Sequence, residues 1–289
     1  MTFLDWIPLL ILPSASVFFS RHHLPDWAFM FVLSFSIFFG FKWLTYRRAL
    51  IKGAAPDIKI SLGYIFAWVG MDAVSFFNKQ TEIRRPSKEE WISAILKTFL
   101  GGIILWLLPG QFYPQHKILA GYIGLAGFII IIFFGFFHVI SLAWRQNGIN
   151  TRPLMNSPLL ARSLSDFWSN RWNLAFRDLD RIFIFRPAVK RAGFTSATIA
   201  AFLFSGLLHD LVISLPAETG YGLPTLYFLI QAGGVLIEKS GFGKRAGLNR
   251  DLKGWLFAVL FLVIPAVLLF HPPAVENIIN PFMETVRAV

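Results

Sequence analysis

Long hydrophobic segments most restrict how this chain can fold. Of its 289 residues, 55% are hydrophobic and 15% are charged, too little charge for a soluble domain of this length. A helix needs about 20 largely apolar residues to cross a bilayer. We therefore predict an all-α integral membrane protein, a polytopic bundle of seven or eight membrane segments forming one membrane-embedded domain over residues 1–289. The candidate segments are about Phe3–Phe19, Trp27–Thr45, Ile60–Phe77, Trp91–Leu108, Ile118–Trp144, Thr195–Leu215, Tyr221–Ile237 and Trp255–Phe270.

The charged loops predict how these segments are oriented. The chain carries 27 Lys and Arg against 16 Asp and Glu, a formal net charge of +11. Because cytoplasmic loops are enriched in Lys and Arg, we expect Trp144–Gly193 and Glu238–Gly254 to face the cytoplasm. The loops Pro109–Lys117 and Pro216–Gly220 are poor in cations and are expected outside. The positive charge suits anionic membrane lipids or an anionic substrate, whereas no basic face suited to nucleic acid is present.

Two further features of the sequence limit the chemistry. The chain has no cysteine, which excludes disulfides, thiolate metal sites and a cysteine nucleophile. The N-terminal stretch MTFLDWIPLL has no Lys or Arg before its apolar run, so we interpret it as a retained membrane segment and not as a signal peptide.

The segment Ile60–Phe77 fits the charge pattern poorly. Basic stretches flank it on both sides, YRRALIKGAAPDIK before it and NKQTEIRRPSKEE after it, yet a spanning helix would place one of them outside. The segment also contains Gly63, Gly70 and Asp72. It is therefore either a re-entrant or interfacial element, or a genuine span with a weak charge bias.

A polar stretch between the fifth and sixth segments predicts an amphipathic helix. Ser163 followed by Asp166 resembles a capping box, and Pro187 is expected to end the helix. An apolar stripe recurs at the helical period. One interpretation is a helix lying on the cytoplasmic leaflet with its arginines among the headgroups. The amides and acids between its tryptophans favour a second role, that of facing a substrate cavity.

His209 and Asp210 lie side by side in an apolar run, AFLFSGLLHDLVISL. Ionisable residues inside a membrane are costly and often functional. The spacing places Phe202, Ser205, Gly206 and His209 on one helix face. His209 is therefore either a hydrogen-bonded packing residue or a general base, which needs one imidazole of near-neutral pKa beside an alcohol.

Other chemistries fit this run less well. Ser205 lacks the tight glycine-flanked turn of a serine nucleophile. A metal site needs three or more ligands, for which His209, Asp210 and the distant His138 make a weak set, so no metal is expected. We interpret His138 as structural or pore-lining. The remaining histidines are expected on the surface: His22, His23, His116 and His271.

Three motifs follow one another in a characteristic order. They are WVGMDAVSFF (Trp68–Phe77), SLSDFWSNRWN (Ser163–Asn173) and FLFSGLLHD (Phe202–Asp210). Together, over about residues 68–210, they resemble the membrane-bound O-acyltransferase family and most closely its wax-synthase-like branch. The chain departs from the branch at Val69 in place of proline, at Ser169–Asn170 in place of Gly-Arg, and at Asp210 in place of glutamate. These departures bear on the substrate more than on the reaction class.

The resemblance implies a fold and a reaction. Members of the family transfer an acyl group from a thioester, usually acyl-CoA, to a hydroxyl, with donor and acceptor meeting in a tunnel inside the membrane. The family's histidine corresponds to His209, the general base. Its asparagine-bearing motif corresponds to Asp166, Trp168, Arg171, Trp172 and Asn173.

The resulting hypothesis is ester formation between an acyl thioester and a lipophilic alcohol. His209 takes the hydroxyl proton, and Asn173 positions the donor or stabilises the oxyanion. We expect no cofactor apart from acyl-CoA as co-substrate, with arginines receiving its phosphates, and location in a bacterial inner membrane or the endoplasmic reticulum. The predicted substrate-binding residues are Asp166, Trp168, Arg171, Trp172, Arg177, Ser205 and Asp210.

Two other functions remain open at this point. One is a proton-coupled transporter that uses Asp72, His138, His209 and Asp210 as a relay. The other is a non-catalytic membrane scaffold, which would tolerate apolar replacement of His209 and Asn173. The lack of an internal repeat weighs against the common transporter folds.

Overall fold

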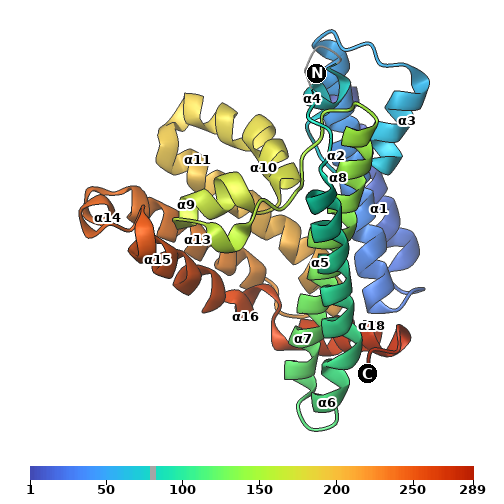
Figure 1. The fold of residues 1–289 in the computed structure, drawn as a ribbon, viewed down its shortest axis with the longest axis vertical. Coiled ribbons are helices and arrows are strands. Elements are labelled where there is room, and N and C mark those ends of the chain that lie inside the picture. The colour runs from blue at the N-terminus through green and yellow to red at the C-terminus, as the bar shows by residue number, and fades with distance from the viewer. Residues whose placement is uncertain (79–82) are drawn as a thin grey trace. The chain divides into compact units, whose positions relative to one another are not determined.

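Helices make up all the regular structure of the residues described, which are 1–78 and 83–289 of a computed structural model. The fold class predicted from the sequence, an all-α polytopic membrane protein, is confirmed. The chain forms two compact units, residues 1–154 together with 278–289, and residues 155–277 (Figure 1). The single domain over 1–289 stays a prediction.

The first unit contains the N-terminal helices and the C-terminal helix. A short 3-10 turn, Phe3–Trp6, leads into α1, and α7 continues through the π-helical turn Ile130–Phe136 into α8. The helices are α1 (Ile7–Ser20), α2 (Asp26–Ile51), α3 (Ile58–Ala67), α4 (Ala73–Phe77), α5 (Lys88–Leu107), α6 (Pro109–Phe112), α7 (Lys117–Ile129), α8 (Phe137–Gln146) and α18 (Asn280–Thr285).

The second unit contains two of the three motifs. Its helices are α9 (Leu164–Asp166), α10 (Leu174–Asp180), α11 (Arg186–His209), α12 (Leu215–Ala217), α13 (Leu223–Lys239), α14 (Gly241–Ala246), α15 (Asp251–Val263), α16 (Ala266–Leu269) and α17 (Pro272–Ala274). Four shorter elements also lie in this unit: a 3-10 turn Pro158–Leu160 and the π-helical turns Phe167–Arg171, Arg181–Phe185 and Asp210–Ser214. A further π-helical turn, Val275–Ile279, leads into α18.

Six helical stretches are long and apolar enough to cross a membrane, among the residues described. They overlap six of the eight predicted segments, and the predicted segment Tyr221–Ile237 largely forms α13, which has 17 residues. Large apolar side chains remain exposed on these helices, as lipid contact requires, for example Phe18, Phe99 and Val263. The spans are Phe3–Ser20, Asp26–Ile51, Lys88–Phe112, Lys117–Gln146, Leu174–Ala217 and Asp251–Leu269.

The segment Ile60–Phe77 does not form one continuous helix. α3 ends after ten residues, Trp68 has an extended backbone (φ −132°, ψ 129°), and α4 begins only at Ala73. Ten helical residues extend about 15 Å, half of a hydrocarbon core of about 30 Å. The break therefore favours the re-entrant or interfacial interpretation over a genuine span. Of the basic stretch that follows, residues 79–82 lie outside the described residues.

A fully buried lysine holds this break in place. The Lys42 ammonium of α2 donates a 2.6 Å hydrogen bond to the Gly70 carbonyl and lies 3.4 Å from the centre of the Tyr64 ring. At the start of α4, Asp72 accepts hydrogen bonds from the backbone and hydroxyl of Ser75. The Trp68–Phe77 motif is thus anchored to α2 by a cation that an aromatic face and a carbonyl stabilise.

The predicted amphipathic helix Ser163–Pro187 starts where expected, but its continuity and its end were predicted wrongly. The Ser163 hydroxyl accepts from the Asp166 amide, 3.2 Å away, as the cap requires. The helix is interrupted at Asn173, whose φ of 39° is left-handed. Pro187 does not end a helix, because it lies in the first turn of α11, where a missing N–H is tolerated. The helical path breaks at Gly193 instead, with φ 77° and ψ 179°.

Replacing Gly193 by alanine should destabilise the protein through backbone strain alone. A Cβ at this position would meet no neighbour within 4 Å, but its φ/ψ region is essentially restricted to glycine. We expect Gly193→Ala to lower the free energy of unfolding by about 1–3 kcal/mol, measured by unfolding in mixed micelles. Gly233→Ala is the matched control, because Gly233 is helical and equally free of neighbours. A stability for Gly193→Ala equal to that of the control would contradict this account.

Candidate active site

The His209 imidazole has a defined orientation at the end of α11. Its Nδ1 lies 2.7 Å from the carbonyl oxygen of Ser205, one turn earlier in the same helix. A carbonyl can only accept, so Nδ1 carries the proton and donates it. The neutral ring then has its lone pair on Nε2. The helix therefore presents His209 in the tautomer that a general base needs.

α13 packs closely against α11 beside this ring. A Cβ on Gly206 would lie 2.6 Å from the Thr225 Cα, so only glycine at position 206 allows the two helices to approach this closely. One turn further along α13, the Phe228 ring centre is 4.6 Å from that of His209. The Ser205 hydroxyl is buried and donates to the Ala201 carbonyl, 3.1 Å away. The Ser205 hydroxyl thus bonds within its own helix, and the Ser205 carbonyl bonds to His209.

Asp210, next in the chain, points to other partners. One carboxylate oxygen accepts from the Gly222 amide at 2.7 Å and from the Ser214 hydroxyl at 3.1 Å. The other accepts from the Thr225 amide at 3.1 Å and from the Thr225 hydroxyl. Both oxygens are thus occupied by groups of this chain, and its predicted substrate-binding role stays a prediction.

Asp166 organises the start of the SLSDFWSNRWN motif. Its carboxylate accepts from Arg171 Nε at 2.6 Å, from the Arg162 amide at 3.0 Å and from Asn170 Nδ2 at 3.0 Å. Partial burial raises the pKa of Asp166, but these three hydrogen bonds and the Arg171 charge outweigh it and hold that pKa below its ordinary value. The Arg171 guanidinium also donates to the Ser157 carbonyl, 3.1 Å away. Asp166 and Arg171 therefore fold the motif onto the preceding loop.

Asn173 lies at the interruption of this motif. Its Oδ1 accepts a hydrogen bond from the Phe176 amide at 3.2 Å and so caps α10. Its backbone N–H donates to the Met155 sulfur, 3.4 Å away. Within the part of the chain that the structure describes, no hydrogen bond from its Nδ2 and none between Asn173 and His209 is present. Asparagine tolerates the left-handed conformation better than other non-glycine residues. The residue therefore turns the chain and keeps two amide hydrogens for another partner.

The two tryptophans of the motif differ in their surroundings. The Trp168 ring packs edge-on against Phe202 of α11, 5.6 Å between centres, and its Nε1 donates to Gln231 of α13 at 3.4 Å. Trp168 also packs against Phe228, 5.7 Å between ring centres, and is thereby linked to His209 through one shared aromatic ring. The Trp172 ring stacks on Phe167. Trp168 therefore lies next to the histidine's surroundings, and Trp172 lies further away, linked to Trp168 through the Phe167 ring.

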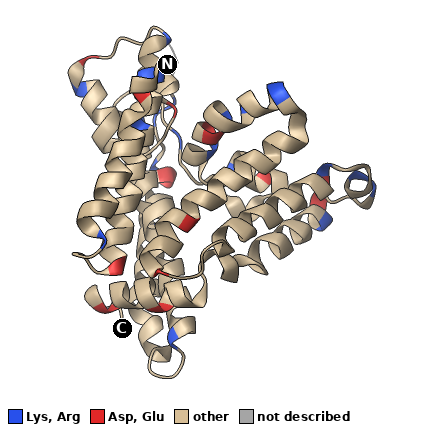
Figure 2. Ribbon diagram, turned by 180° about the vertical axis from the view of Figure 1, so that it is seen from behind, with Lys and Arg blue, Asp and Glu red and all other residues tan. Residues whose placement is uncertain are grey.

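The predicted phosphate-binding arginines have acidic neighbours. Arg177 pairs with Asp178 at 2.7 Å and donates to the Ser169 carbonyl at 2.7 Å, as Arg171 pairs with Asp166. Exposed cations gather elsewhere in this unit, around α14 (Figure 2). They are Lys239, Lys244, Arg245, Arg250 and Lys253.

Comparison with known proteins bears on the same stretch. Residues 151–230 match the model of the membrane bound O-acyl transferase family. The family resemblance is confirmed. The matched segment includes every predicted site residue, whereas the Trp68–Phe77 motif lies outside it.

Plant wax-type acyltransferases are among the relatives. The chain is 30% identical over 158 residues to a probable long-chain-alcohol O-fatty-acyltransferase 3 of Arabidopsis thaliana, covering 50% of this chain and 46% of the relative. It is 30% identical over 143 residues to the long-chain-alcohol O-fatty-acyltransferase of Simmondsia chinensis, covering 45% and 40%. A probable long-chain-alcohol O-fatty-acyltransferase 9 of Arabidopsis thaliana is 33% identical over 138 residues, covering 43% and 40%. The matches thus span less than half of each of these relatives.

Sequence reasoning missed buried polar residues that pack against the family segment, residues 151–230. Glu238 of α13 is fully buried and accepts from the amide of Ser165, 2.9 Å away, and from its hydroxyl. Gln231, also fully buried, joins Trp168 to the Phe261 carbonyl, to which it donates at 2.6 Å. Both are polar residues inside an apolar helix, and that pattern was a signal available in the sequence.

His271 was wrongly predicted to lie on the surface, although His22, His23 and His116 are exposed as expected. Only 1% of His271 is exposed. The Ala274 amide donates to its Nδ1 at 3.2 Å and caps α17, while its Nε2 lies 3.5 Å from the Ser214 hydroxyl. Sequence reasoning failed here because a histidine in front of two prolines looks like a loop residue.

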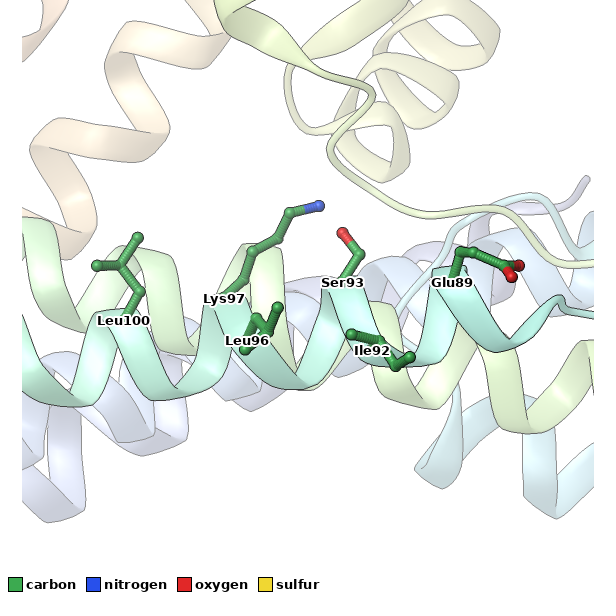
Figure 3. A pocket seen from close by; sticks show the side chains of 6 residues that line it. All are labelled: Glu89, Ile92, Ser93, Leu96, Lys97 and Leu100. Carbon is green, nitrogen blue, oxygen red and sulfur yellow. The ribbon is translucent and has the colours of Figure 1, made fainter.

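The other unit carries a shallow hollow of about 380 Å³. Figure 3 shows that its lining comes from the single helix α5, with Ser93 and Lys97 pointing the same way. It contains none of the predicted site residues, so the tunnel expected from the resemblance stays a prediction. The lining residues are Glu89, Ile92, Ser93, Leu96, Lys97 and Leu100.

Acid should weaken the packing around His271. Burial lowers the pKa of this imidazole below its ordinary 6.5, partly offset by the charge of Asp210. The folded state disfavours the protonated ring, because Nδ1 faces a donor. The ring's contribution to stability is thus complete above pH 6.5 and is lost as the pH falls through the folded-state pKa. We expect His271→Asn, which keeps an acceptor for the Ala274 amide, to flatten the acid side of a plot of thermal unfolding temperature against pH. Identical plots for variant and wild type would contradict this.

Proposed function

We propose that this chain transfers an acyl group from a thioester, with acyl-CoA as donor, to the hydroxyl of a lipophilic long-chain alcohol. The support comes from the family match over residues 151–230 and from relatives named long-chain-alcohol O-fatty-acyltransferases. The product is an ester of the wax type. The transporter hypothesis finds no support in either comparison.

The observation that carries this proposal is the tautomer of His209. With the proton on Nδ1 directed at the Ser205 carbonyl, the lone pair on Nε2 is available to an incoming hydroxyl. The alcohol oxygen attacks the thioester carbonyl carbon while its proton passes to Nε2. The tetrahedral intermediate then collapses, the C–S bond breaks, and the imidazolium returns the proton to the departing sulfur. Ester and free thiol are formed, and His209 is regenerated.

Asn173 supplies hydrogen-bond donors in this proposal. Its Oδ1 is occupied by the Phe176 amide, so its orientation is fixed and Nδ2 faces away from the cap. A preorganised donor of this kind stabilises the negative oxygen of a tetrahedral intermediate more than the carbonyl from which it forms. Asn173 therefore acts on the acyl donor, and His209 acts on the acceptor.

The other predicted residues have supporting roles. Arg171 and Arg177 contribute positive charge toward the phosphates of the donor. Trp168 forms part of the apolar wall beside His209, and Asp166 keeps the motif folded. No cofactor takes part in the chemistry, and the basic loops face the cytoplasm, where the donor is soluble.

Replacing His209 should abolish most of the transfer. Proton transfer by a positioned base contributes about 10²- to 10⁴-fold in rate, so we expect His209→Ala to lower kcat on that scale. The assay offers radiolabelled acyl-CoA and a long-chain alcohol to purified protein in detergent and counts ester and free thiol together.

The control is His22→Ala, because His22 is exposed and lies outside the family segment. Circular dichroism and gel filtration establish that both variants fold. Wild-type protein that forms no ester with any long-chain alcohol would disprove the proposed function. A fully active His209→Ala variant would remove His209 from the mechanism and leave the reaction class standing.

A further inference from the structure

The start of α13 lacks a cap of its own. Its N-cap residue is Gly222, which has no side chain, and Pro224 in its first turn has no N–H. The amides of Gly222 and Thr225 nevertheless need an acceptor, since unpaired amides at a helix N-terminus are costly. Asp210, from the end of the preceding membrane helix, accepts from both of them and from the Thr225 hydroxyl. A carboxylate at a helix N-terminus is also favoured by the helix dipole.

The same contacts fix how α13 is placed along α11. Gly206 and Asp210 are one turn apart, and Thr225 contacts both, through its Cα at Gly206 and through its amide and hydroxyl at Asp210. Phe228 follows Thr225 by three residues and lies on the next turn of the same face. A shift of α13 along α11 would therefore carry the Phe228 ring past His209.

Phe228 is what limits the rotation of the imidazole. The ring is 4% exposed, and its centre is 4.6 Å from that of His209, at an interplanar angle of 43°. The Ser205 carbonyl holds the Nδ1 edge, and Phe228 covers a face, so Nε2 keeps one direction. Without Phe228, the imidazole could turn about its Cβ–Cγ bond and lose the hydrogen bond that sets its tautomer.

We propose that Asp210 is a positioning residue: by clamping the first turn of α13 through Thr225 and Gly222, it holds Phe228 against His209 and keeps Nε2 aimed at the acceptor hydroxyl. This inference rests on the proposed function of His209. It also accounts for the occupied carboxylate of Asp210, whose two oxygens receive four hydrogen bonds from this chain and have no need of substrate.

Thr225→Val tests the clamp with little change of shape. It removes the hydroxyl bonded to Asp210 and keeps the amide, the volume and the contact with Gly206. Because a misplacement of about 1 Å can cost about 10²-fold, we expect kcat to fall by about 10- to 100-fold while KM for the alcohol stays within about two-fold. Thr225→Ser, which keeps the hydroxyl, should restore kcat.

The matched control is Thr198→Val. Thr198 is a buried threonine of α11 whose hydroxyl, among the residues that the structure describes, bonds only to the Phe194 carbonyl of its own helix. If loss of any threonine hydroxyl in these two helices sufficed, this variant would lose as much kcat as Thr225→Val. The double variant Asp210→Asn with Thr225→Val should lose no more than Asp210→Asn alone, because both remove one interaction.

A second readout does not depend on acyl transfer. Diethyl pyrocarbonate modifies imidazole nitrogens, and mass spectrometry reports the rate for each histidine peptide. We expect Thr225→Val to raise the rate at His209 and to leave the exposed His22, His23 and His116 unchanged. Wild-type protein that makes no ester would disprove the proposed function, while this measurement would still decide on the clamp.

The clamp is overturned by any of three results. These are unchanged His209 modification in Thr225→Val, equal losses in Thr225→Ser and Thr225→Val, and a loss confined to KM. Faster modification of His209 together with recovery in Thr225→Ser supports it.

Discussion

The contact between α11 and α13 at Gly206 and Thr225 determines the geometry around His209. Glycine lets the two backbones approach until no Cβ would fit, and that closeness brings Phe228 onto the imidazole. Helix packing in membranes relies on such small residues, because lipid offers little hydrophobic force between helices. Gly206 therefore has a role in helix packing that is separate from the chemistry of His209.

Buried and half-buried polar groups in the second unit form hydrogen-bonded pairs between different elements. Glu238 accepts a hydrogen bond from Ser165, and Gln231 accepts one from Trp168. Asp210 accepts one from Thr225. Each pair joins α13 to a different part of the family segment. In a medium of low dielectric, satisfied polar contacts of this kind specify one arrangement, since leaving either partner unpaired is expensive. α13 thus serves as the common support of both motifs in this unit.

The sequence allowed the helical class, the extent of most membrane segments and the motif residues to be predicted, because apolar runs and capping signals are local. Ser163 shows this: its hydroxyl and the amide it caps are three residues apart. The left-handed turn at Asn173 and the burial of His271 could not be predicted in this way. Both depend on partners or conformations that the neighbouring residues do not encode, such as Ser214, 57 residues before His271.

The reactivity of Lys42 can report whether the surrounding part of the first unit is folded. Its ammonium is wholly enclosed, held by the Gly70 carbonyl and the Tyr64 ring. Amine-directed reagents react with accessible, deprotonated side chains. In the folded chain Lys42 is shielded, while Lys52, just after α2, is exposed. Acylation of Lys42 therefore requires the α2–α4 region to open, so the extent of its modification records how often that region opens in detergent or in lipid.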